Sequence, residues 1–327
     1  MTEPLVDILL ATYNGERFVG EQIESIQAQT HKNWRLLVSD DCSSDRTLDV
    51  VRRYSADDNR IRIVSEGVKH GGAKENFFSL MRCSDANYCM FCDQDDVWLP
   101  EKVEKSLVAL RALEDGQREN LPLLVFCDMK VVDAKLNILS DSFERRSKFD
   151  IDRLKLENLI ALNIAAGCTM LVNSKLIEAM LNCNDISKIA MHDWWAMLVA
   201  SALGCIYYID TPLSLYRQHG DNEVGSKKYS PLERARQLDF MAAQMDSTID
   251  QAYEFLSLFG SFLTLKEMRH LNAYCKIRSC NNVFFAVINL FKSRCLKQWP
   301  RCLGQFYIAI KLGGSTLVSK KGFELHG

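Results

Sequence analysis

The chain of 327 residues lacks the long apolar run of an integral membrane protein. No stretch reaches the roughly 18 consecutive apolar residues that a membrane-spanning helix needs. The nearest candidate, residues 159–172, is interrupted by Asn163, Gly167 and Thr169, and predicts buried core instead. The start, Met1 to Pro4, has no basic region of the kind that opens a secretory signal. We therefore expect a cytoplasmic protein that is not integral to the membrane.

Several fingerprints of other ligand-binding classes are also missing. The twelve cysteines have no histidine partners at the spacing of a zinc site, so we expect reduced, mostly buried thiols. Neither a Walker loop nor a dinucleotide fingerprint is present, which argues against ATP and NAD as ligands. No RNA- or DNA-binding signature appears, so nucleic acid is not an expected partner.

The charge that is present is unevenly distributed. Hydrophobic residues make up 47% of the chain and charged residues 25%, as in ordinary soluble globular proteins. Residues 1–260 carry a net charge of −11, whereas residues 261–327 carry 11 basic and two acidic residues, a net +9. This asymmetry predicts an acidic body and a basic end that meets an anionic surface.

The first half of the chain alternates short apolar runs with helical patterns, which predicts βαβ units and a parallel sheet. We expect strands over residues 5–10, 34–38, 61–64 and 88–92, and helices over 16–29, 46–54, 74–81 and 101–113. The second half is mixed, with strands expected over 123–128, 168–173, 206–209 and 214–217, and helices over 154–162 and 193–203. From Pro231 onward the pattern is almost wholly helical.

The most informative stretch is residues 88–98, where an apolar run ends in the carboxylates Asp93, Asp95 and Asp96. A buried strand that ends in acids places negative charge at its carboxyl end, where open α/β sheets bind ligands. Asp93 and Asp95 are two residues apart, so a bend lets both point at one Mg²⁺ or Mn²⁺ ion, which prefer oxygen ligands. The alternative is an ordinary solvated loop.

Polar residues follow two other predicted strands as well. Thr12, Tyr13 and Asn14 follow the first strand, and Ser39 to Asp41 follow the second. Because parallel strands share the edge at which they end, we expect these residues and Asp93 to Asp95 to crowd together there.

Five motifs resemble those of a known enzyme family. Residues 11–15, 38–45 and 91–98 resemble the inverting family 2 glycosyltransferases, and residues 191–195 and 216–222 are similar to their bacterial rhamnosyltransferase branch. The likeness covers about residues 5–225. It implies a GT-A fold, which is an α/β, Rossmann-like nucleotide-sugar-binding fold with a mixed, mainly parallel sheet flanked by helices. A helical C-terminal extension would follow it.

The resemblance also implies the domains and the reaction. A GT-A catalytic domain would span residues 1–228, with a nucleotide-binding half over 1–115 and an acceptor-binding half over 116–228, followed by a basic helical region over 229–327. The enzyme would move a sugar from a nucleotide-diphosphate donor to a polysaccharide or lipid-linked glycan of the bacterial surface. The branch favours L-rhamnose from dTDP-L-rhamnose, although a UDP-hexose or UDP-N-acetylhexosamine donor would use the same motifs.

By resemblance, Asp95 is the principal metal ligand, Asp93 contacts the ribose or the metal, and His219 completes the metal site. Bound Mn²⁺ or Mg²⁺ would neutralise the charge that develops on the pyrophosphate leaving group. The alternative for His219 is a histidine of a surface loop.

The donor's base and phosphates have expected partners too. Thr12 and Tyr13 would line the base pocket, and Asp41 would accept the N3–H of a uracil or thymine. Lys74, at the N-terminus of a predicted helix, and Arg217 suit the phosphates. The alternatives are a strand-end turn for Asp41 and a solvated lysine at position 74.

The resemblance places the catalytic base at Asp193. An aspartate has an unperturbed pKa of about 3.9 and is ionised at pH 7. Trp194 and Trp195 would bind the acceptor by excluding water and stacking on sugar faces. The alternative is a helix cap at Asp193 with both tryptophans in the core. Many family members carry glutamate at the position of His192, which leaves the role of His192 open.

The basic C-terminal region predicts contact with a membrane. An amphipathic helix over residues 283–291 lies beside Lys292, Arg294, Lys297 and Arg301. Basic residues near an anionic leaflet contribute about 1 kcal/mol each. We expect peripheral binding to the inner face of the plasma membrane, where a lipid-linked acceptor is found. The alternatives are a helical cap on the catalytic domain and a contact within a homo-oligomer.

Two rival functions remain. A nucleotidyltransferase would need a basic triphosphate loop after the first strand, and residues 13–16 offer none. A non-catalytic nucleotide-sugar-binding partner in a glycan-assembly complex would have lost Asp95 or Asp193, and both are present.

Overall fold

The computed structural model describes residues 3–118, 120–219, 231–280 and 282–314. The chain forms two compact units. The first unit comprises Met1–Leu154, Asn163–Ile186 and Met191–Lys227, and the second comprises Lys155–Leu162, Ser187–Ala190 and Lys228–Gly327. The predicted domain boundary near residue 228 lies outside the described residues and stays a prediction.

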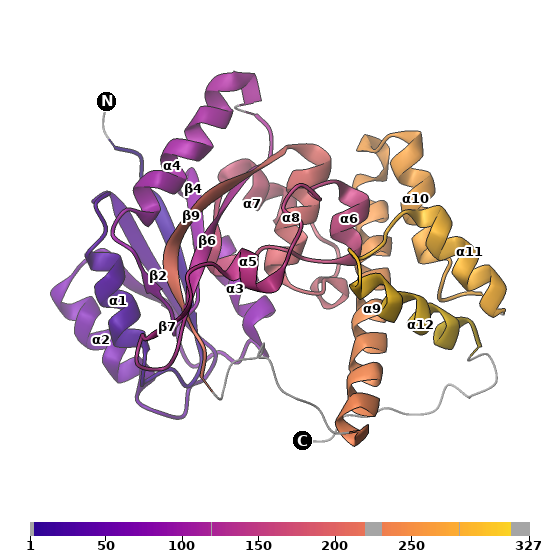
Figure 1. Ribbon diagram of the computed structural model, residues 1–327. Coiled ribbons are helices and arrows are strands. Elements are labelled where there is room, and N and C mark those ends of the chain that lie inside the picture. The colour runs from indigo at the N-terminus through magenta and orange to yellow at the C-terminus, as the bar shows by residue number, and fades with distance from the viewer. Residues whose placement is uncertain (1–2, 119, 220–230, 281, 315–327) are drawn as a thin grey trace. The chain divides into compact units, whose positions relative to one another are not determined.

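The first unit is built on a nine-stranded sheet, whose N-terminal part is parallel (Figure 1). Its strands β3 (Ile61–Ser65), β2 (Trp34–Asp40), β1 (Val6–Thr12) and β4 (Tyr88–Cys92) lie in that order. The helices α1 (Val19–Gln27), α2 (Thr47–Asp57) and α3 (Ala73–Cys83) connect them. The predicted βαβ units are therefore confirmed.

The rest of the sheet is mixed. The order continues from β4 through β8 (Met170–Asn173), β6 (Leu123–Val132) and β9 (Cys205–Arg217) to β5 (Val97–Trp98), and β7 (Ile138–Ser140) pairs with β6. Strand β8 is antiparallel to both β4 and β6, whereas β6 and β9 are parallel. The sequence predicted two strands within residues 206–217, but a register shift near Pro212 lets one strand continue past the proline.

Alternating residues of the buried strands face opposite layers of helices. Val6, Ile8 and Leu10 of β1 share a core with apolar residues of α1, α2 and α4 (Lys102–Leu113). Phe91 of β4 points to the other side and meets Phe77 of α3 edge to face at 5.6 Å. Helices α7 (Ser174–Leu181) and α8 (His192–Leu203) contact α3, and a short α5 (Phe143–Ser147) lies beside β6.

The twelve cysteines are all free thiols, as the sequence predicted. Cys89 and Cys92 form a C-x-x-C pattern, yet both are buried within strand β4. A zinc or redox role for this pair is not supported, because residues three apart in a strand point to opposite faces.

The second unit is helical. It contains α6 (Leu156–Ala161), α9 (Pro231–Phe259), α10 (Leu265–Cys275), α11 (Val283–Ser293) and α12 (Arg301–Gly314). Its core includes Ile249, Phe255, Leu271 and Leu290, all fully buried. Among the described residues, none of the helices combines the length and the apolar character that crossing a bilayer requires.

Candidate active site

The loops that follow β1, β2 and β4 meet at one edge of the sheet, as the sequence predicted. The Thr12 hydroxyl donates a hydrogen bond of 2.8 Å to Asp40, which joins the ends of β1 and β2. The Gln94 amide, in the loop after β4, accepts from the Tyr13 N–H at 2.9 Å and donates to the Tyr13 carbonyl at 2.8 Å. This clamp leaves the Tyr13 side chain 58% exposed, and therefore accessible to a ligand.

Asp41, the predicted base contact, organises the loop before α3. Its carboxylate accepts from the backbone N–H groups of His70, Gly71 (3.1 Å) and Gly72 (2.9 Å). Gly71 and Gly72 have φ angles of +92° and +148°, which favour glycine and let successive N–H groups converge on one anion. A base N3–H would therefore meet a carboxylate that already accepts several donors.

The two predicted phosphate ligands lie in different surroundings. Lys74 is in the first turn of α3, with its Nζ 3.3 Å from Glu75. Arg217 ends β9 and is only 1% exposed. Its Nε donates to the Asp95 carbonyl at 2.8 Å and its Nη1 donates to the Ala134 carbonyl at 2.9 Å. Arg217 thus braces the loop that carries the acids, and phosphate contact by either side chain stays a prediction.

Two of the predicted metal ligands are adjacent. The Nε2 atom of His219 lies 2.8 Å from Oδ2 of Asp95, although 124 residues separate them in the chain. The imidazole also packs on the Phe18 ring, with centroids 4.8 Å apart. The fold therefore brings His219 to the strand edge that bears Asp93 and Asp95.

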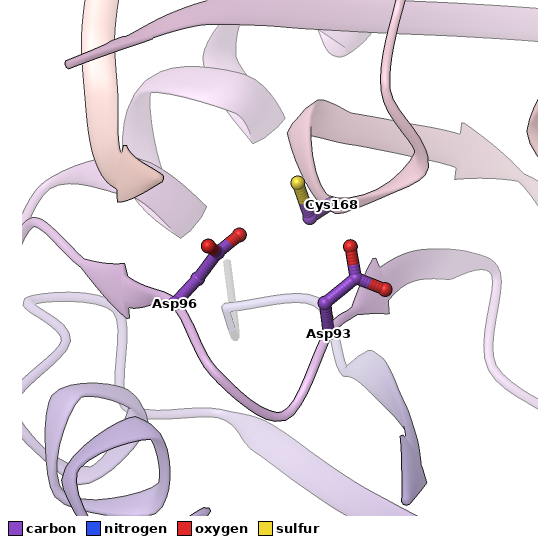
Figure 2. Close-up of side chains that lie close together, drawn as sticks. All are labelled: Asp93, Asp96 and Cys168. Atoms are coloured by element: carbon purple, nitrogen blue, oxygen red, sulfur yellow. The ribbon is translucent and has the colours of Figure 1, made fainter. Parts of the chain in front are cut away.

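The structure adds two residues that sequence reasoning did not assign to the site. Figure 2 shows the side chains of Asp93, Asp96 and Cys168 turned toward one another. Their ligand atoms lie within 4.8 Å of each other. Cys168 belongs to a 3-10 turn, Gly167–Thr169, that leads into β8. No spacing pattern links it to the acids, because the contact exists only once β8 pairs with β4.

Crowding of carboxylates dominates the electrostatics here. Burial, and then the charges of Asp96, Asp95 and Asp193, raise the pKa of Asp93 well above its usual range. Burial and the charge of Asp95 raise the pKa of Asp96 to about 7. The buried cations close by are Arg217 and Lys102, whose Nζ donates to the Cys168 carbonyl.

These residues fit a divalent cation. The four carboxylates outnumber the nearby basic side chains, because Arg217 is also paired with Glu21 at 2.5 Å and leaves Lys102 as the other buried cation. The Oδ2 atom of Asp96 is buried, and within the described residues the donor beside this carboxylate is the weakly polar Cys168 thiol. Oxygen ligands of this kind suit Mg²⁺ and Mn²⁺.

Asp193, the predicted base, lies in the first turn of α8, whose N-cap is Met191 rather than Asp193. Its carboxylate accepts from the N–H groups of Trp194 (2.6 Å) and Gly167 (3.1 Å). A Cβ atom at Gly167 would lie 2.7 Å from the His192 imidazole, so glycine permits this close approach. Burial raises the pKa of Asp193 to about 6.

The neighbours of Asp193 are packed inside the protein. The His192 ring stacks on Phe77 at 3.9 Å, and burial lowers the pKa of His192 to about 3, so the imidazole is neutral at pH 7. Trp195 is fully buried, and its indole N–H donates to the Met180 carbonyl at 3.3 Å. Trp194 is also buried. This burial favours the core alternative for both tryptophans, and their contact with an acceptor stays a prediction.

Comparison with known proteins identifies the family. Residues 7–178 match the family described as "Glycosyl transferase family 2". The chain belongs to glycosyltransferase family 2. It is 29% identical over 227 residues to the dTDP-rhamnosyl transferase RfbG of Shigella flexneri, an alignment that covers 66% of this chain and 74% of that protein. It is 25% identical over 260 residues, 79% of this chain and 93% of the relative, to the Escherichia coli protein WfgD, named a UDP-Glc:alpha-D-GlcNAc-diphosphoundecaprenol beta-1,3-glucosyltransferase.

Solved structures of glycosyltransferases confirm the GT-A fold. TarS 1–349 of S. aureus, in complex with UDP-GlcNAc, superposes with a TM-score of 0.54 at 15% identity, over 94% of this chain and 90% of the TarS 1–349 chain. The mannosyltransferase PcManGT of Pyrobaculum calidifontis, in complex with GDP-Man and Mn²⁺, gives a TM-score of 0.56 at 14% identity, over 96% and 86% of the two chains. The predicted family, enzyme class and fold are therefore confirmed.

The pKa of Asp193 predicts how transfer by this glycosyltransferase depends on pH. A base with a pKa of about 6 is protonated below that value, so kcat/KM should fall as the pH drops through about 6 and should level off above it. The measurement is a pH–rate profile at saturating Mn²⁺. Saturation prevents the titration of Asp93 and Asp95, the expected metal ligands, from limiting the rate. A profile that is flat through pH 6, or a rate that rises on acidification, would contradict Asp193 as the base.

Proposed function

We propose that this enzyme transfers a sugar with inversion from a nucleotide-diphosphate donor, using Asp193 as the general base. The observation that carries the proposal is that the acids at the sheet edge come from two different elements. Asp93 and Asp95 follow β4, whereas Asp193 comes from α8 and is held by the Gly167 and Trp194 N–H groups. Asp93 and Asp95 would bind the cation that neutralises the diphosphate, and Asp193 would accept the proton of the acceptor hydroxyl.

The proposed step is a single displacement at the anomeric carbon. Asp193 takes the proton from an acceptor hydroxyl as the hydroxyl oxygen forms its bond to that carbon, and the bond to the diphosphate oxygen breaks. Because the hydroxyl attacks from the side opposite the leaving group, the configuration at the anomeric carbon is inverted. A Mn²⁺ or Mg²⁺ ion held by Asp93, Asp95 and His219 would stabilise the charge that develops on the diphosphate. Arg217 keeps this loop in place through the Asp95 carbonyl.

The donor is proposed to be dTDP-L-rhamnose. The similarity to RfbG, whose name states dTDP-rhamnosyl transfer, supports this choice. Thr12, Tyr13 and Asp41 would hold the thymine, and Lys74 the phosphates. UDP-glucose and UDP-N-acetylglucosamine are the alternatives, because WfgD is named for UDP-Glc and TarS binds UDP-GlcNAc.

The acceptor is proposed to be a growing polysaccharide or lipid-linked glycan in bacterial surface-glycan synthesis, such as that of O-antigen. The name of WfgD, which specifies a diphosphoundecaprenol-linked acceptor, supports this class. Since Trp195 is fully buried, the tryptophans would act on the acceptor mainly by shaping the wall behind Asp193.

Replacing Asp193 tests the catalytic proposal directly. Asp193→Asn removes the base but keeps the size of the side chain, so transfer should fall by about 10²–10⁴-fold. Binding of the donor, followed by calorimetry, should stay within a factor of about two. The exposed Asp152→Asn is the matched control and should transfer normally. Full transfer by Asp193→Asn would assign the base to another residue, and no transfer by the wild type with any donor would favour a non-catalytic partner.

We further propose that the helical unit binds the cytoplasmic face of the membrane. Helices α11 and α12 and the loop between them expose large apolar side chains, 45–72% accessible, which we call the aromatic face: Phe284, Phe285, Phe291, Trp299, Leu303, Tyr307 and Ile310. In α12 the last three recur at helical spacing and so share one side. The exposed Lys292, Arg294 and Lys311 lie nearby in the chain. Aromatic groups flanked by cations suit an anionic lipid interface.

Replacing part of the aromatic face tests this contact. The variant Phe284→Ser, Phe285→Ser, Trp299→Ser should bind vesicles of phosphatidylglycerol and phosphatidylcholine at least about tenfold more weakly, because less apolar surface enters the interface. Phe262→Ser, which changes an equally exposed phenylalanine elsewhere, should bind as the wild type does. Unchanged vesicle binding together with a smaller assembly in light scattering would assign the face to a homo-oligomer instead.

A further inference from the structure

Cys168 lies beside Asp93 and Asp96, and the proposed transfer step gives this thiol no role. The residue is fully buried, and its thiol faces Asp93 and Asp96 (Figure 2). The three ligand atoms lie within 4.8 Å of one another, and a shared ion would draw them closer, because Zn–S and Zn–O bonds are about 2.3 Å and 2.0 Å long. Asp93 is only half-buried, whereas Asp96 and Cys168 are buried.

Asp96 supplies a second and independent indication of a ligand. Its Oδ1 atom accepts from the Arg217 backbone N–H at 3.2 Å, whereas its buried Oδ2 atom has no donor beside it stronger than the Cys168 thiol within the described residues. A buried carboxylate oxygen served only by a weak donor is costly. The closest buried ammonium, Lys102, is directed to the Cys168 carbonyl and lies 4.1 Å from the centre of the Trp98 ring. A bound cation would satisfy the oxygen.

We propose that Asp93, Asp96 and Cys168 form a site for a thiophilic divalent cation, of the class of Zn²⁺. Thiolate ligands select softer ions, whereas Mg²⁺ and Mn²⁺ prefer oxygen alone. One sulfur and two carboxylate oxygens make three protein ligands, and water takes the fourth position of a tetrahedral zinc ion. As the Zn–S bond forms, the Cys168 thiol releases its proton to solvent.

This site shares Asp93 with the Mn²⁺ or Mg²⁺ site of the proposed function. Zn²⁺ bound beside Cys168 should therefore withdraw a ligand from the Asp95–His219 pair and inhibit transfer. This consequence rests on the proposed function. The zinc site itself does not, because binding can be measured without a nucleotide sugar.

The test uses Co²⁺, a coloured substitute for Zn²⁺, added to the full chain without donor. The background carries Cys42→Ser and Cys83→Ser, which remove the two exposed thiols. We expect one Co²⁺ per chain with a thiolate-to-cobalt charge-transfer absorption that Zn²⁺ abolishes. Cys168→Ser should eliminate the absorption, and Cys89→Ser, which changes another buried thiol, should leave it intact. No absorption, or an absorption that survives Cys168→Ser, would overturn the proposal.

A measurement on the unaltered chain tests the site even if the Cys168→Ser variant does not fold. X-ray absorption of the protein loaded with one equivalent of Zn²⁺ should show a sulfur ligand at about 2.3 Å. Asp96→Asn should keep the sulfur signal but weaken zinc affinity by roughly tenfold or more. A zinc shell of only oxygen and nitrogen in the wild type would refute the site, whatever the outcome of the transfer assays.

Discussion

The constraint on which this molecule depends is the mutual repulsion of carboxylates held at one edge of its sheet. Asp93, Asp95 and Asp96 follow β4 and Asp193 comes from α8, and Asp96 is fully buried while the other three are only partly exposed. Desolvation and neighbouring charges raise the pKa values of Asp93 and Asp96. The cluster persists because backbone N–H groups, Arg217 and Lys102 surround it. A site of this kind favours positive charge, which is why we propose a divalent cation as the partner of the donor's diphosphate.

The fold is arranged so that distant segments support this edge. Arg217, at the end of β9, donates to the Asp95 carbonyl, and Gly167, before β8, donates to Asp193. The first contact ties the end of β9 to the loop after β4, and the second ties the turn before β8 to the start of α8. The aromatic face belongs to the other compact unit, so the proposed membrane contact and the proposed transfer site lie in separate parts of the chain. Loss of one activity should therefore leave the other intact.

Sequence reasoning was most reliable where the signal was local. The strands β1 to β4 are continuous apolar runs followed by polar residues, and alternation with helices makes their parallel order predictable. The site at their ends followed from that order. Cys168 was not predictable, because only the pairing of β8 with β4 brings it to Asp93 and Asp96. The sequence predicted two strands in place of β9 because Pro212 interrupts the apolar pattern. The short strands β5 and β7 were not predicted, because two or three residues are too few to show a strand pattern.

The central claim is that the acids after β4 bind a nucleotide sugar through a divalent cation. The most direct test is calorimetric titration of the purified protein with dTDP-rhamnose and a panel of UDP-sugars, with and without Mn²⁺, in parallel with Asp95→Asn. The account predicts that one donor binds only when Mn²⁺ is present, and that Asp95→Asn abolishes this binding. Equal binding with and without the ion, or metal-dependent binding that survives Asp95→Asn, would contradict it.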